Sequence, residues 1–289
     1  MVERSKRFDG MIRRWIPSSA TLSYNPLFKL VGYGSDVFWN LIFKEFRQLP
    51  PNHLRVRVGV GNQMFRNQHL CLRSGTNYWL NAFADQICRF DSNIVEIGCG
   101  YGRKAYHLLN YELQGQRFSG TYHGVDIDEE LLAFARKKFP APQYSFQLTP
   151  HKSQTYGTTA ASDGVQCRIE REDDSQDFLF STSLVTHLLE PELLNYITQS
   201  HRVLRPGGFT QMNFFCMDFL RDKKILGSRW TFAHRIGRAH VESQQYPEAA
   251  VAYNQEDMIA FYRNAGFNEV QILTDPNGKM AQSFVRARK

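Results

Sequence analysis

The chain has 289 residues, with 35 Lys+Arg against 28 Asp+Glu for a formal net charge of +7, and 42% of its residues are hydrophobic. That apolar share is ample for a packed core and excludes wholesale disorder. No apolar run reaches about 18 residues, and no apolar stretch follows the basic segment at residues 1–18. Neither a membrane-spanning helix nor a secretory signal is therefore expected.

The first 90 residues differ from the rest in charge, since they hold 13 Lys+Arg and only 5 Asp+Glu. Hydrophobic spacing predicts a helix over 36–46, a short half-buried strand over 54–60 and a helix over 78–90. We therefore expect residues 1–90 to form a basic, aromatic and mainly helical N-terminal extension or cap. Its positive charge indicates either an anionic partner or a merely solvated surface.

Five cysteines are spread along the chain, and no two of them form a C-x-x-C pair. An odd count without such pairs argues against a disulfide framework and against structural zinc. No other group of His, Asp, Glu and Cys has metal-ligand spacing, so no metal is predicted. A reducing, cytoplasmic location is the expectation.

From residue 92 onward, apolar runs alternate with helical patterns. Strands are predicted over 94–97, 122–125, 144–148, 177–181, 208–215, 269–273 and 282–286, and helices over 103–113, 129–139, 190–204 and 257–265. This alternation predicts a doubly wound α/β domain over 91–289, with a mostly parallel seven-stranded sheet. The turn residues at 275–278 predict a hairpin and hence an antiparallel last strand. Residues 149–176 form a long loop, and 217–255 a candidate substrate lid.

A glycine-rich loop follows the first of these strands. Gly98, Gly100 and Gly102 allow a tight turn and a close approach to a ligand, and the helix that follows directs its N-terminal amides toward that ligand. In a dinucleotide fold the third glycine would fall at Arg103. Glu96 stands just before the loop, where it disfavours a pyrophosphate and favours a cationic ligand such as S-adenosylmethionine (SAM).

A second carboxylate, Asp126, ends the next strand, where it can accept hydrogen bonds from ribose hydroxyls. A strand, three glycines, a helix, a strand and a terminal Asp together predict a nucleoside site. The alternative is a doubly wound domain that binds another nucleoside.

The segment from Ile94 to Phe215 resembles class I SAM-dependent methyltransferases, as do the turn at 203–209 and the strand entry at 264–270. The resemblance covers roughly residues 91–289 and implies a SAM-dependent methyltransferase with SAM as cofactor. It implies that the cofactor contacts are Glu96, Gly98, Cys99, Gly100, Gly102, Asp126, Ile127, Ser181 and Thr182. One departure concerns residues 148–156, which lack the carboxylate that many relatives place near the adenine.

Methyl transfer to a hydroxyl requires a base, and three histidines are catalytic candidates. His187 follows the fourth predicted strand, and its alternative role is to pack against the next helix. His234 and His240 lie in the candidate lid, with Glu242 and Tyr253 as further base or orienting groups. A solvated insertion is the alternative for this second cluster.

Two functions follow from these features. The first is methylation of a small-molecule acceptor, a sugar or another metabolite, at oxygen. The second is methylation of a macromolecule, RNA or protein, docked by the basic N-terminal segment. No RNA-binding module is recognised, so a small molecule fits better than nucleic acid. A third reading, a binding module without turnover, fits poorly with the intact glycine loop. The oligomeric state is not predicted.

Overall fold

A computed structural model of the chain describes residues 22–58, 67–73, 75–110, 112–113, 115–149, 167–227, 230–275 and 280–289. The chain divides into two compact units, residues 1–74 and 75–289. This boundary comes earlier than the expected residue 90, because helix α6 (Thr76–Ala84) belongs to the second unit and its Trp79 packs in that unit's core. None of the described helices is long and apolar enough to cross a bilayer.

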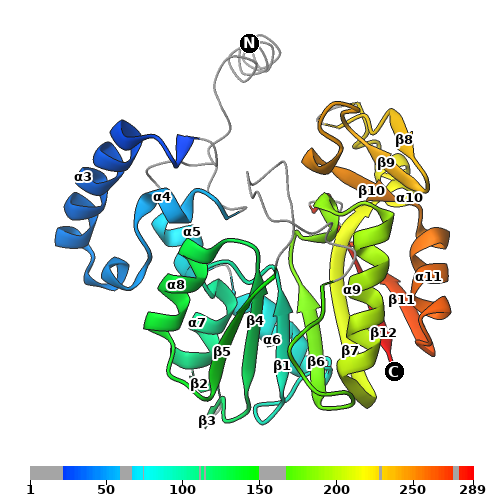
Figure 1. Cartoon of the computed structure of the whole chain (residues 1–289), viewed down its shortest axis with the longest axis horizontal. Helices are drawn as coiled ribbons and strands as arrows, with labels where there is room; N and C mark the ends of the chain where they lie inside the picture. The colour runs from blue at the N-terminus through cyan, green and yellow to red at the C-terminus, as the bar shows by residue number, and fades with distance from the viewer. Residues whose placement is uncertain are drawn as a thin grey trace. The chain divides into compact units, whose positions relative to one another are not determined.

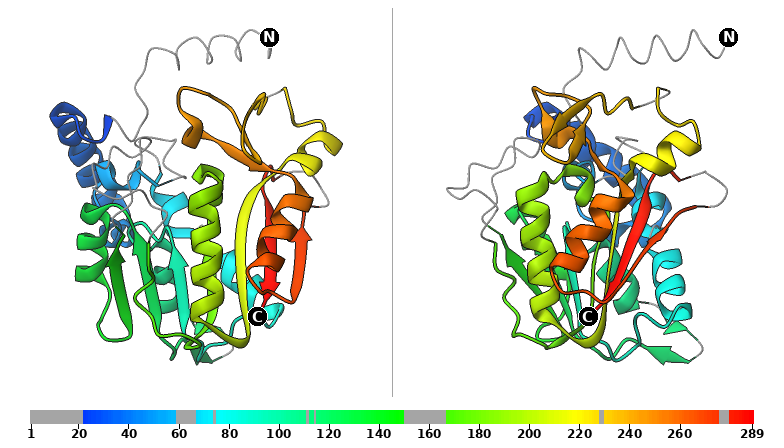
Figure 2. Two further views of the ribbon diagram at one scale, coloured as in Figure 1. Left: turned by 45° about the vertical axis from the view of Figure 1, so that its right-hand side comes forward. Right: turned by 90° about the vertical axis from the view of Figure 1, so that its right-hand side faces the viewer.

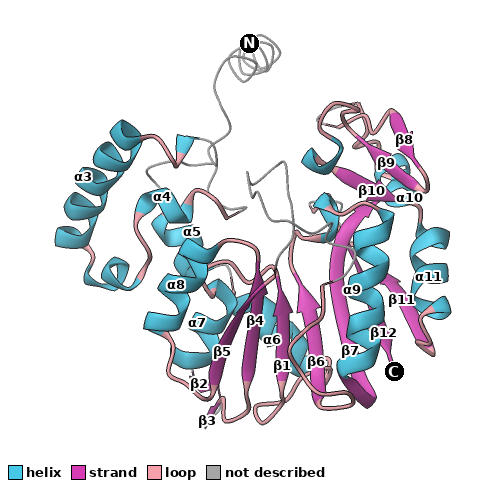
Figure 3. Cartoon of the chain, in the orientation of Figure 1, coloured by secondary structure: helices cyan, strands magenta, loops and turns pink. Residues whose placement is uncertain are grey.

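Every described element of the first unit is helical (Figure 3). The elements are α3 (Pro26–Ile42), the 3₁₀ helix η1 (Lys44–Gln48), α4 (Asn52–Arg55) and α5 (Gln68–Arg73). Helix α3 begins at Pro26 because the Asn25 side chain accepts the amide hydrogens of Leu27 and Phe28. The helix predicted over 36–46 thus begins earlier and ends at Ile42.

The strand predicted over 54–60 is wrong for its described part, which is helix α4 and a following turn. Arg55 and Arg57 alternate with apolar residues, but both are buried. Arg55 donates to the carboxylate of Asp36 at 2.6 Å, and the Nε of Arg57 donates to the Ser23 hydroxyl at 3.0 Å. These two cations are therefore engaged inside the unit and add nothing to a free basic surface.

The second unit is built on one sheet whose core has the predicted seven strands (Figure 1). They are β1 (Ile94–Ile97), β4 (Tyr122–Asp126), β5 (Tyr144–Leu148), β6 (Gln176–Ser181), β7 (Leu204–Cys216), β11 (Glu269–Leu273) and β12 (Ser283–Arg288). The order β5-β4-β1-β6-β7 is parallel, and β12 runs antiparallel to both β7 and β11. The mostly parallel sheet with an antiparallel last strand is confirmed.

Helices cover both faces of this sheet, as a doubly wound fold requires. On one face, Trp79 of α6, Ala105 of α7 (Arg103–Asn110) and Ala135 of α8 (Glu129–Lys138) share a core with Phe178 and Phe180. The opposite core joins the alternate strand residues to α9 (Glu190–Val203) and α11 (Gln255–Asn264). Figure 2 shows α11 in orange against β11 and β12. The period-two alternation of β6 thus divides its side chains between two cores.

The insertion after β7 contains three strands that the sequence did not predict. After α10 (Met217–Asp222) come β8 (His234–Ile236), β9 (Ala239–Val241) and β10 (Val251–Tyr253), with the 3₁₀ helix η4 (Pro247–Ala249) before β10. Strand β10 pairs parallel with the last residues of β7, so the insertion extends the sheet to ten strands. The candidate lid over 217–255 is therefore an ordered continuation of the sheet in its described part.

Three further boundaries differ from prediction. The helix expected over 78–90 is α6, which begins at Thr76 and ends at Ala84. The helix expected over 103–113 ends at Asn110, and residues 112–113 pair with 116–117 as a small hairpin, β2–β3. Strand β7 begins at Leu204 rather than residue 208. Most of the long loop over 149–176 and the turn at 276–278 lie outside the described residues.

Candidate functional site

The carboxyl ends of β1, β4 and β6 lie at one edge of the sheet, because the three strands are parallel and adjacent. At this edge β1 passes into the glycine loop. Gly98, Gly100 and Gly102 have φ values of 76°, 56° and 80°, which side-chain-bearing residues rarely adopt. A Cβ atom on Gly102 would lie 2.5 Å from the Phe139 ring. The loop therefore requires glycine for both conformation and space.

Asp126 binds the glycine loop to the end of β4. Its carboxylate accepts the amide hydrogens of Gly100 at 2.6 Å, Ile127 at 2.8 Å and Asp128 at 3.0 Å. Burial raises the pKa of Asp126 to about 6. The side chain is thus fixed in orientation and ionised at neutral pH.

Glu96 lies in β1, two residues before the first glycine of the loop. It is buried and accepts a hydrogen bond from the Tyr122 hydroxyl on the neighbouring strand β4. Lys104, at the start of α7, is buried close enough to interact with it. Burial raises the pKa of Glu96 and lowers that of Lys104. Glu96 was identified from the sequence, but its two neighbours, Tyr122 and Lys104, were missed. The one available signal was for Lys104, a lysine at the N-terminus of a helix.

The other expected cofactor contacts differ in accessibility. Ile127 and Thr182 are half-buried and stand at the ends of β4 and β6. Cys99 and Ser181 are buried, and Cys99 packs inward so closely that a Cβ on Gly124 would lie 2.7 Å from its Sγ. The Ser181 hydroxyl has no hydrogen-bond partner among the described residues.

The residues present fit a SAM molecule in three respects. Because its three left-handed residues are glycines, the loop has no side chains at these positions that would keep its backbone away from a ligand. A carboxylate has about four acceptor positions, of which Asp126 uses three for amides, so it can still accept a ribose hydroxyl. Glu96 and Asp126 also place two acidic groups within electrostatic range of each other, which suits a cationic ligand.

His187 lies in the 3₁₀ helix η3 (Val185–His187), just after β6. Its Nδ1 lies 2.8 Å from the main-chain carbonyl of Glu248 in η4. A carbonyl can only accept, so Nδ1 carries the hydrogen and the neutral ring has its lone pair at Nε2. Burial lowers the pKa of His187, which keeps the imidazole neutral at pH 7. The ring is therefore oriented and able to accept a proton.

The structure separates His240 from His187. Ala239, Val241 and Tyr253 share the core that contains Val185 of η3. Along β9, His240 stands between Ala239 and Val241, so its side chain points to the other face of the strand. Its partner across the ladder, Ala252, belongs to a different core, which includes Leu220 of α10. Because side chains alternate across a strand, the two histidines lie on opposite faces of the insertion. His240 is buried and its Nε2 has no partner among the described residues.

The remaining candidates in the insertion have structural contacts. Glu242 accepts the amide hydrogens of Thr231 and Phe232 at 2.7 and 2.8 Å. The Tyr253 hydroxyl donates to the Leu188 carbonyl at 2.9 Å, and burial raises its pKa. His234 is half-buried in β8, where it pairs with Val241. Glu242 therefore joins two parts of the insertion, and Tyr253 ties the insertion to the residue that follows η3.

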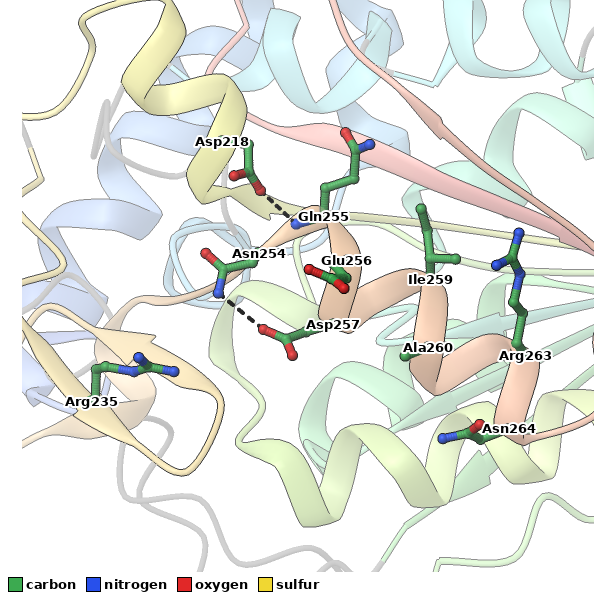
Figure 4. A pocket seen from close by; sticks show the side chains of 10 residues that line it. All are labelled: Asp218, Arg235, Asn254, Gln255, Glu256, Asp257, Ile259, Ala260, Arg263 and Asn264. Atoms are coloured by element: carbon green, nitrogen blue, oxygen red, sulfur yellow. Dashed lines mark hydrogen bonds between the residues drawn. The ribbon is translucent and has the colours of Figure 1, made fainter.

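A pocket of about 1040 Å³ runs along α11, from Asn254 to Asn264 (Figure 4). It is lined by Asp218, Arg235, Asn254, Gln255, Glu256, Asp257, Ile259, Ala260, Arg263 and Asn264. Asp218 accepts the Gln255 amide hydrogen at 2.7 Å, and Asp257 accepts a hydrogen bond from Asn254 at 3.0 Å. No predicted cofactor or catalytic residue lines this pocket, so it is separate from the glycine loop.

Comparison with known proteins agrees with this geometry. Residues 95–212 match the family model described as a methyltransferase domain. A Rickettsia typhi protein named ubiquinone/menaquinone biosynthesis C-methyltransferase UbiE is 26% identical over 204 residues, which cover 66% of this chain and 75% of that protein.

Two solved structures are similar in fold. An inferred O-methyltransferase from Nostoc punctiforme is 13% identical to this chain, with a TM-score of 0.51. The match covers 78% of this chain and 59% of the Nostoc protein. A SAM-dependent methyltransferase from Methanosarcina mazei is 18% identical over 72% of this chain and 96% of that one, with a TM-score of 0.47. At these identities the likeness concerns the fold alone.

Proposed function

This chain is a class I SAM-dependent methyltransferase, and from that premise we propose that it methylates a hydroxyl oxygen of a small-molecule acceptor, with His187 as the base. SAM supplies a methyl group on a cationic sulfonium, so the protein's part is to bind, orient and deprotonate. The observation that carries the proposal is the hydrogen bond from His187 Nδ1 to the Glu248 carbonyl at the carboxyl edge of β6.

We assign cofactor binding to the residues around the glycine loop. The loop amides and the Asp126 carboxylate bind the ribose end, Ile127 lies against the adenine, and Thr182 closes the methionine side. Glu96 contributes its charge from within the core, since it is buried in contact with Tyr122. Cys99 and Ser181 shape the site from within the core, because neither is exposed to a ligand.

The insertion supports a small acceptor. Phe215, Trp230 and Phe232 pack against one another with ring centroids 4.7–6.4 Å apart, so the segment after β7 has its own core. Its η4 helix supplies the carbonyl that orients His187. An ordered segment that holds the base suits an enclosed acceptor better than a polymer surface.

The experiment uses the full chain and SAM labelled in its methyl group, incubated separately with a low-molecular-mass metabolite fraction, total RNA and total protein. We expect label in the metabolite fraction, with turnover reduced at least about 100-fold in His187→Gln. His240→Gln serves as the matched control, since it lies on the other face and should retain turnover. Label only in RNA or protein would contradict the proposal.

A carbon acceptor is the second candidate, because the Rickettsia typhi relative is named a C-methyltransferase. The same base would then remove a proton from an activated carbon. Mass spectrometry of the product distinguishes the two, since an O-methyl group leaves on ether cleavage and a C-methyl group does not.

A further inference from the structure

Helix α3 presents an apolar face to solvent. Leu27, Leu30 and Leu41 are 68%, 68% and 72% exposed, and Val31, Phe38 and Ile42 are also exposed. At 100° per residue these side chains lie within one half of the helix circumference. The face runs from residue 27 to residue 42, about 22 Å along the axis. Apolar surface as continuous as this marks a binding site more often than chance exposure.

The polar side of α3 is the side that packs inside the first unit. Gly32 lies so close to α4 that a Cβ there would be 2.9 Å from the Asn52 Oδ1. Asp36 accepts the Asn52 amide hydrogen at 2.7 Å and pairs with the buried Arg55 at 2.6 Å. A buried ion pair is costly to break, so it fixes which face of α3 turns inward. The apolar face is therefore held outward by specific contacts.

The first unit has a positive formal charge, and described cations lie just beyond the end of this face. Residues 1–74 contain 12 Lys+Arg and 4 Asp+Glu. Within 22–58, Lys44 and Arg47 are exposed just beyond the end of α3, and Lys29 is half-buried on it. Glu45 is the only exposed carboxylate in that described stretch, since Asp36 is buried. An apolar face with exposed cations at one end complements a surface that is apolar inside and anionic outside.

We propose that the apolar face of α3 docks this chain onto an anionic lipid bilayer, with the helix lying in the interface between headgroups and acyl chains. The leucine-rich face would enter the acyl boundary while the cations meet the headgroups. A second copy of the chain fits less well, because symmetric pairing of this face would bring two strongly positive units together. Nucleic acid would leave the leucines without a partner.

The test is co-sedimentation of the full chain with vesicles of phosphatidylcholine alone, or of three parts phosphatidylcholine to one part phosphatidylglycerol. The key variant is Leu30→Asp/Leu41→Asp. The matched control is Leu70→Asp/Ile236→Asp, which places the same charges at exposed apolar residues outside α3. Circular dichroism and SAM binding verify that both variants fold.

We expect the wild type and the control to bind the anionic vesicles alike, and the α3 variant to bind at least about tenfold more weakly. Binding should also weaken with added salt and on phosphatidylcholine alone. A wild type that stays in the supernatant, or an α3 variant that binds as well as the control, overturns the proposal. Sedimentation velocity without lipid provides a second check. A wild-type dimer that the α3 variant abolishes would also overturn the proposal, because it would assign the face to a second copy of the chain.

Discussion

Replacement of Asp126 by Asn tests the role of this carboxylate without a change in side-chain size. The carboxylate accepts three backbone amides, with Gly100 on one oxygen and Ile127 and Asp128 on the other. An Asn side chain has one oxygen, so its amino group must face at least one of these N–H donors. The glycine loop loses an anchor, and the ribose hydroxyl loses its charged acceptor.

The expected loss of SAM affinity follows from the charge-assisted hydrogen bond. Such a bond contributes about 1.5–3 kcal/mol, which corresponds to about 10- to 150-fold in Kd. Isothermal titration of SAM into Asp126→Asn measures it. The control is Glu129→Gln, which removes a carboxylate that pairs with Arg136 on the surface, and its Kd should stay within about twofold of the wild type. A Kd for Asp126→Asn within threefold of the wild type would refute the assignment.

Three further predictions concern pH, catalysis and stability. Burial raises the pKa of Asp126 to about 6, so the carboxylate is ionised above that pH, and SAM affinity should fall by up to about tenfold per pH unit below it. SAM titrations from pH 7.5 to 5 should show this slope in the wild type. An equal slope in Asp126→Asn would exclude Asp126 as its source. His187→Ala should lower kcat at least about 100-fold while the Kd of SAM stays near the wild-type value, and an unchanged kcat in steady-state assays would make His187 structural. Asp36→Ala leaves Arg55 buried without its carboxylate, so urea denaturation should show a loss of about 3–5 kcal/mol in the stability of the first unit; a loss below about 1 kcal/mol would contradict the buried pair.

The central strands β1 and β6 could be predicted because they are buried on both faces and each contains a short apolar run. Strand β1 matches its predicted bounds, and β4 extends its prediction by one residue. Strands β8 to β10 have three residues each, too few for a periodic pattern. The alternation at 54–60 misled because Arg55 and Arg57 form contacts with residues distant in sequence. Such tertiary pairing is invisible in local periodicity.

The glycine loop and the acid at the end of β4 could be located from the sequence because their signals are local. Glycines before a helix and an acid at a strand end follow from neighbouring residues alone. The contact of Glu96 with Tyr122 depends instead on how β1 and β4 lie side by side, where Glu96 is level with Gly124. The separation of His240 from His187 depends on the pleat of β9 and β10. Neither could be inferred from spacing along the chain.

The most direct measurement is calorimetric titration of the full chain with SAM, and then with NAD⁺ in the presence and absence of SAM. A loop of left-handed glycines between two carboxylates should bind SAM at one site and show no competition from the dinucleotide. Absence of any heat of SAM binding at millimolar ligand, or displacement of SAM by NAD⁺, would contradict the assignment of this loop as the methyl-donor site.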